Sequence, residues 1–201
     1  VKKVRIIRLE SPGENFTVER EFIALGEVEN YISSKDARNL EFEKGRIYYP
    51  AQWFSGFKRF MYNIKKKADE AGNMVHWMNS PEDIIKMFDK PASQSMLKKN
   101  NVKVPAVLEN VKSYHQLRTM MENADISRVF VKLAYSSSAS GVAAYQIQPK
   151  TKKEIMITSA ELARKGREIV LYNSLKIKRY TSGADIRDII NWICNQGAHV
   201  E

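Results

Sequence analysis

Two short apolar runs separated by a loop of small residues form the most distinctive pattern in the chain. Val129–Val131 precede Lys132, and Val142–Tyr145 resume the apolar pattern after the loop Ser136–Gly141. Runs of this length around a serine- and glycine-containing loop predict the two strands of a hairpin. Small loop residues leave backbone N–H groups and hydroxyls accessible to a negatively charged ligand, and a plain flexible hairpin tip is the alternative.

Apolar positions spaced three and four residues apart predict helices along the rest of the chain. Asn15 and Ser80 are typical helix caps, Pro50 suits a first helical position, and Gly26 suits a helix end. In the longest of these helices, Trp53, Phe57, Phe60, Met61 and Ile64 share one face. The predicted helices cover residues 15–25, 50–71, 80–90, 92–99, a segment that begins at Ser113, and 184–195.

The remaining apolar runs predict further strands. A buried strand is expected at residues 3–9, and a short one at 46–49. Residues 73–79 are predicted as a connector between two helices. Residues 159–166, between the first two of the strands expected later in the chain, are predicted as a short helix or a loop. Those later strands are at residues 154–158, 168–172, 175–180 and from 199 onward. Together the elements predict an α/β fold.

Composition narrows the classes of protein. No apolar run approaches the roughly 20 residues of a membrane helix. Cys194 is the single cysteine of the 201 residues, which excludes an internal disulfide and favours a reducing, cytoplasmic location, with the thiol packed in a core. The net charge of +10 is compatible with nucleic acid, nucleotide phosphates or an acidic surface. Because the sequence lacks an initial Met and stops soon after a strand begins, we expect a fragment of a longer protein.

Standard nucleotide and hydrolase motifs are missing from the sequence, but an ordered set of weaker signals is present. Neither G-x-x-x-x-G-K-[ST] nor a helix-opening G-x-G-x-x-G occurs, and no serine lies in G-x-S-x-G. The set consists of Asn79-Ser80-Pro81, then Asp89-Lys90, then Asn101–Pro105, and finally Phe130–Val142. In order and spacing over residues 79–146 it resembles the ATP-grasp superfamily, in particular a bacterial branch of these enzymes.

The resemblance implies an architecture and a set of site residues. Residues 1–78 would form the α/β domain that precedes an ATP-grasp module, and residues 79–201 the N-terminal α+β subdomain of that module, ending at a hinge strand. Glu201 would lie in that hinge, near adenine or ribose. The remaining ATP-binding residues would be two phosphate-binding lysines, Lys90 and Lys132, and the loop residues Ser136, Ser137, Ser138, Ser140 and Gly141.

The resemblance also implies an activity. The parent protein would be an ATP-dependent ligase that joins a carboxylate to an amine or another nucleophile through an acyl phosphate. The Mg²⁺ ligands of the family lie beyond the hinge, so this chain would lack the metal-binding half and would catalyse nothing alone. Here the loop departs from the family pattern, because Gly141 is its single glycine and the backbone is correspondingly less permissive.

A basic nucleic-acid-binding domain without catalytic activity is the alternative function. Lysine- and arginine-rich segments recur at residues 65–67, 98–99, 150–153 and 176–179. The aromatic residues Tyr172 and Tyr180 lie on either side of the last segment. Affinity for such a partner would fall steeply with salt. The charges are spread along the whole chain and no nucleic-acid-binding motif accompanies them.

Overall fold

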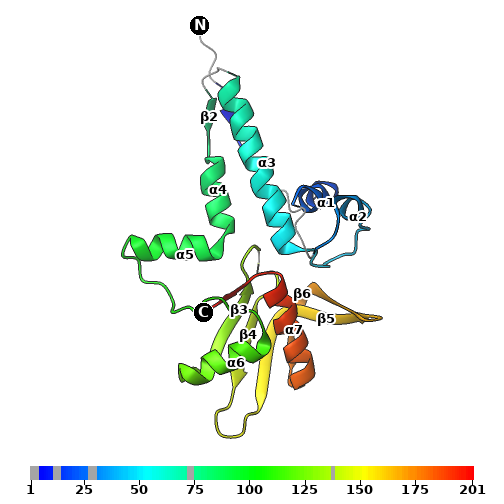
Figure 1. The fold of residues 1–201 in the computed structure, drawn as a ribbon, viewed down its shortest axis with the longest axis vertical. Coiled ribbons are helices and arrows are strands. Elements are labelled where there is room, and N and C mark those ends of the chain that lie inside the picture. The colour runs from blue at the N-terminus through cyan, green and yellow to red at the C-terminus, as the bar shows by residue number, and fades with distance from the viewer. Residues whose placement is uncertain (1–4, 11–14, 27–30, 72–74, 137–138) are drawn as a thin grey trace. The chain divides into compact units, whose positions relative to one another are not determined.

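The structure, a computed structural model, describes residues 5–10, 15–26, 31–71, 75–136 and 139–201, and these divide into two compact units (Figure 1). Unit 1 comprises Val1–Phe42 and Ala51–Ser93, and unit 2 comprises Glu43–Pro50 and Gln94–Glu201. The expected mixed α/β class is confirmed at this coarse level, while the module boundary after residue 78 stays a prediction. The expected turn at residues 11–14 lies outside the described residues.

Unit 1 is built on an aromatic contact between helices. Its helices are α1 (Phe16–Leu25), α2 (Ser34–Arg38), α3 (Pro50–Glu70) and α4 (Pro81–Phe88). Rings from three of them meet, since the centroid of Phe57 lies 5.6 Å from that of Phe22 and 5.1 Å from that of Phe88. The Asn15 side chain accepts hydrogen bonds from the first turn of α1, and the Ser80 side chain does the same for α4, as their caps predict.

Two expectations for unit 1 are wrong. Residues 75–77 form the strand β2 (Val75–Trp77) where a connector was expected, and they pair in parallel with β1 (Arg5–Ile7). β1 ends at Ile7, before the end of the expected strand, and it is not buried, because Ile6 is 72% exposed. A two-stranded ribbon buries little apolar surface, so the pairing with β2 leaves Ile6 in solvent.

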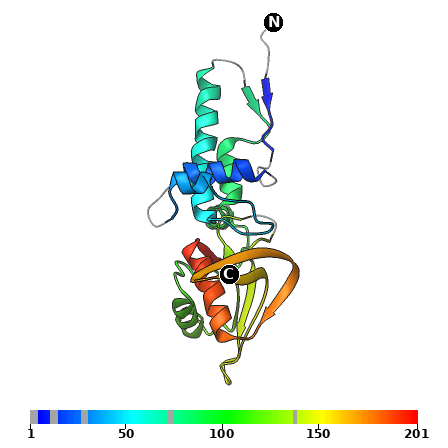
Figure 2. The same cartoon turned by 90° about the vertical axis from the view of Figure 1, so that its right-hand side faces the viewer.

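Unit 2 is a five-stranded antiparallel sheet in the order β6-β5-β4-β3-β7. Its helices α6 (Tyr114–Asn123) and α7 (Gly183–Asn195) lie on one face of the sheet (Figure 2). The core between sheet and helices includes Leu117, Val131, Tyr145 and Ile190, each at 0% exposure. The strands are β3 (Arg128–Leu133), β4 (Ala143–Ile147), β5 (Glu154–Lys165), β6 (Glu168–Tyr180) and β7 (Ala198–Val200).

The predicted hairpin of residues 129–146 is confirmed as β3 and β4, with Phe130 opposite Ala144. The short helix or loop expected at 159–166 is wrong, because β5 continues through most of it after an irregularity between Thr158 and Ala160. Of the short strand expected at 46–49, the structure shows an isolated bridge between Arg46 and Tyr172. Helix α5 (Lys90–Lys99) begins two residues earlier than expected, since proline is tolerated in a first helical turn.

Candidate functional site

Two residues that are 69 positions apart in the sequence meet where β3 pairs with the edge strand β7. Lys132 lies opposite His199 in the strand register. Two positions along, the Phe130 N–H donates to the Glu201 carbonyl at 2.7 Å, and the Glu201 N–H donates to the Phe130 carbonyl at 3.1 Å. This pairing places the Lys132 ammonium against the Glu201 carboxylate, and Lys132 Nζ donates to Glu201 Oε1. The sheet thereby joins two of the predicted ATP-binding residues.

The Lys132–Glu201 pair is largely withdrawn from solvent. The side chains of Lys132 and Glu201 are 23% and 18% exposed, and that of His199 is 5% exposed. His199 Nε2 lies 3.3 Å from the second carboxylate oxygen, Glu201 Oε2. Burial alone would raise the pKa of Glu201, but the hydrogen bond and charge of Lys132, assisted by His199, hold that pKa below its ordinary value. Glu201 is therefore an anion with both oxygens engaged.

The loop after β3 is shaped by contacts of its own small residues. Ser136 Oγ donates to the Ser140 carbonyl at 3.2 Å, and Ser159 Oγ donates to the Ala139 carbonyl at 2.7 Å. Gly141 has φ of +64° and packs against buried Leu133. The predicted ligands Ser137 and Ser138 lie outside the described residues. In the part of the loop that the structure describes, Ser136, Ser140 and Gly141 shape the backbone.

Lys90 belongs to unit 1, whereas the other predicted ATP-binding residues belong to unit 2. It begins α5, and Asp89 caps that helix by accepting a hydrogen bond from the Ala92 N–H at 2.9 Å. The structure thus brings together Lys132, Glu201 and the base of the loop within unit 2. The joint role of Lys90 with them stays a prediction.

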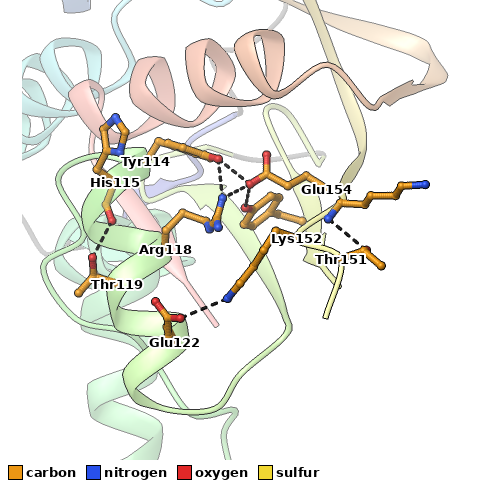
Figure 3. Close-up of polar contacts among 10 residues, drawn as sticks. Tyr114, His115, Arg118, Thr119, Glu122, Thr151, Lys152 and Glu154 are labelled. Carbon is orange, nitrogen blue, oxygen red and sulfur yellow. Dashed lines mark hydrogen bonds and ion pairs between the residues drawn. The ribbon is translucent and has the colours of Figure 1, made fainter. Parts of the chain in front are cut away.

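A polar cluster that the sequence did not reveal lies between α6 and the sheet (Figure 3). Glu154 Oε1 accepts from Tyr114 Oη at 2.5 Å, from Tyr145 Oη at 3.0 Å and from Arg118. Burial raises the pKa of both tyrosines, and the hydrogen bond to Glu154 and its negative charge raise it further. Tyr114, Arg118 and Tyr145 are 40, 36 and 9 positions from Glu154 in the sequence, and no local pattern links them. His199 was also missed as a site residue, although its alternation with Glu201 in a strand was a usable signal.

Among the residues that the structure describes, no group of three or more His, Cys, Asp or Glu side chains could hold a metal ion. No helix in the described part of the chain is both long and apolar enough to cross a bilayer.

Comparison of the chain with protein-family profiles, with curated proteins and with solved structures gives no significant match.

Proposed function

We propose that unit 2 binds the phosphates of ATP and is part of an ATP-dependent ligase that acts on a carboxylate substrate. The observation that supports this proposal is the Lys132–Glu201 pair at the sheet edge, next to a small-residue loop. A half-buried ammonium interacts more strongly with phosphate than a fully solvated one, because less water screens its charge. The resemblance to ATP-grasp sequences supplies the reaction class.

In the proposed reaction, a substrate carboxylate oxygen attacks the γ-phosphorus and ADP leaves. An amine or another nucleophile then attacks the carbonyl carbon of the acyl phosphate, and inorganic phosphate leaves as the new bond forms. Lys132 would neutralise negative charge on the phosphates, and the loop N–H groups and hydroxyls would add hydrogen bonds. Glu201 would keep the Lys132 side chain extended along the sheet edge before the nucleotide arrives. By the resemblance to ATP-grasp sequences, the Mg²⁺ ligands would lie outside this chain.

The test is the affinity for a non-hydrolysable ATP analogue with Mg²⁺, measured by isothermal titration calorimetry on the native chain and on Lys132→Ala. Loss of a charge-assisted hydrogen bond to phosphate should weaken binding by at least about tenfold. Arg128→Ala is the matched control, because it removes one cation from the other end of the same strand and should leave the affinity within about twofold. Equal affinities of the native chain and Lys132→Ala would contradict the site.

Binding to a single-stranded oligonucleotide distinguishes the alternative function. The affinity of a basic nucleic-acid-binding domain for the oligonucleotide would fall steeply between 50 and 200 mM salt, on the order of a thousandfold for several phosphate contacts. The ATP analogue would leave the melting temperature of such a domain unchanged. Under the proposed function, the ATP analogue should raise the melting temperature of the chain and the oligonucleotide should not. Gel shifts at both salt concentrations, run beside thermal melts, separate the two outcomes.

A further inference from the structure

The end of the sheet away from the serine loop carries an open groove of about 700 Å³. It lies at the turn between β4 and β5, whereas the serine loop joins β3 to β4, so the two are at opposite ends of β4 (Figure 1). The groove exists because two neighbouring strands stop at different points. The β5–β6 pairing ends at Met156 and Tyr180, and the chain then leaves the sheet to begin α7 at Gly183. Glu154 and Ile155 therefore line the groove where β6 has left the sheet.

Cations dominate the exposed lining of this groove. Lys153 and Arg179 both line it and are both exposed. Within the described ranges of the chain, neither of them forms an ion pair. The third cation of the lining, Lys152, is engaged with Glu122 at 3.2 Å. Two uncompensated positive charges favour a dianion such as a phosphomonoester over a singly charged carboxylate.

One acidic side chain, that of Glu154, also lines the groove, and three side chains fix it by donating hydrogen bonds to one of its carboxylate oxygens. The Glu154 side chain is 8% exposed, and Tyr114, Tyr145 and Arg118 all bond its Oε1 atom (Figure 3). The other oxygen, Oε2, lies on the groove side, since a Cβ placed on Gly183 would be 3.6 Å from it. No donor among the residues that the structure describes bonds Oε2. A fixed carboxylate oxygen of this kind accepts a hydrogen bond from a ligand without a large entropic cost.

We propose that this groove binds a small phosphomonoester that also carries an ammonium group. The phosphate would lie between Lys153 and Arg179, and Glu154 Oε2 would accept from the ammonium. The amides of Gln146 and Gln148, which also line the groove, would supply further hydrogen bonds. This site is separate from the proposed nucleotide site and does not depend on it.

Two probes that differ by a single group test the proposal: ethyl phosphate and phosphoethanolamine. Titration of the full ¹⁵N-labelled chain with either probe should shift the backbone amides of residues 152–155 and 179–183. Phosphoethanolamine should bind about tenfold more tightly, because its ammonium reaches Glu154. A groove that offers positive charge alone would repel the ammonium, and phosphoethanolamine would then bind more weakly. Equal or weaker binding of phosphoethanolamine would overturn the assignment of Glu154.

Variants test the cations. Lys153→Gln and Arg179→Gln, made singly and together, should each weaken ethyl phosphate binding, and the double variant by at least about tenfold. Both positions are exposed, so the single variants should keep the native spectrum elsewhere. The matched control is Arg167→Gln with Lys176→Gln, which removes two exposed cations from the same strand pair outside the groove. A comparable loss in the control, or no localised shifts in the native chain at millimolar probe, would overturn the site.

Discussion

At the scale of single residues, small side chains and ion pairs set the geometry of the candidate nucleotide site. Lys132 is fixed by Glu201, and the loop that follows it turns back at Gly141, where φ is +64°. In that region of backbone space a Cβ is strained, and glycine has none. A Cβ at Gly141 would also lie 2.7 Å from Leu133 Cδ1, and Leu133 is fully buried. One glycine therefore satisfies the backbone and the core together.

Gly141→Ala should destabilise unit 2 by about 1–2 kcal/mol, from the strained φ, with a further loss from displacement of Leu133. Chemical denaturation of the two proteins measures this difference. The control is Gly166→Ala. Gly166 has φ of +61°, and no atom lies within 4 Å of a Cβ added there, so this variant introduces backbone strain without a steric clash. If both variants lost the same stability, contact with Leu133 would contribute nothing.

At the scale of elements, the α1–α3 contact of unit 1 depends on two glycines. A Cβ at Gly56 would lie 1.8 Å from the Phe22 carbonyl oxygen, and one at Gly26 would lie 1.8 Å from the Gln52 carbonyl oxygen. This close approach lets α3 bind the carbonyl end of α1. The buried Gln52 amide donates to the Ile23 carbonyl at 2.9 Å, and the Arg59 guanidinium donates to the Leu25 carbonyl at 2.8 Å. These two side chains add hydrogen bonds to the last carbonyls of α1, where the regular intrahelical pattern ends.

Gly56→Ala reverses the usual effect of removing a glycine from a helix. In an exposed helix this change stabilises by about 1 kcal/mol, because alanine loses less backbone entropy on folding. Here the backbones must separate, and we expect a net loss of about 3 kcal/mol. Asn63→Ala, at an exposed position of the same helix, should be neutral or slightly stabilising. Thermal melts followed by circular dichroism would show the opposite signs, and a stabilised Gly56→Ala would refute the close helix contact.

At the scale of the whole molecule, unit 2 is built from two separate segments of the chain. Residues Glu43–Pro50 belong to unit 2 although the segments on either side of them in sequence belong to unit 1. The Ile47 N–H donates to the Leu171 carbonyl at 2.9 Å, so this segment adds to β6. Glu43 completes the attachment by accepting hydrogen bonds from Lys165 Nζ at 2.5 Å and from the Tyr172 hydroxyl, and Arg46 Nη1 of its own segment donates to it at 2.6 Å. These hydrogen bonds, from Lys165 first, then Tyr172 and Arg46, lower the pKa of Glu43 to about 2.

This attachment should depend on pH. A carboxyl whose folded pKa is about 2 rather than the ordinary 4.5 stabilises the fold above pH 4.5 and loses that contribution as the pH falls toward 2. Glu43→Gln should therefore melt at a lower temperature than the native chain at pH 7, and the difference should shrink on acidification. Glu109→Gln removes an exposed carboxyl of the same unit and should show a small difference at both pH values. A Glu43→Gln difference that grew below pH 4 would contradict this role.

The sequence by itself determined the local elements. Asn15, Ser80 and Ser113 cap helices as predicted, because a side chain that accepts from the next turn acts within a few residues. The hairpin of residues 129–146 was also predictable, since its strands are adjacent in the chain. Lys132 was singled out from its position at the end of an apolar run, and Glu201 from the resemblance. That the two form an ion pair lay beyond the reach of the sequence.

Only the tertiary structure decided the long-range pairings. β5 passes through a segment that was predicted as a helix or a loop, because its partner β6 stabilises it along nearly its full length. β7 lies beside β3, and this pairing, which no spacing in the sequence encodes, creates the Lys132–Glu201 contact. The Glu154 cluster and the groove beside it arise likewise from the packing of α6 against the sheet and from the departure of β6. Local signals depend on a few neighbouring residues, whereas these sites depend on which strands meet, and the free energy of that choice is spread over the whole core.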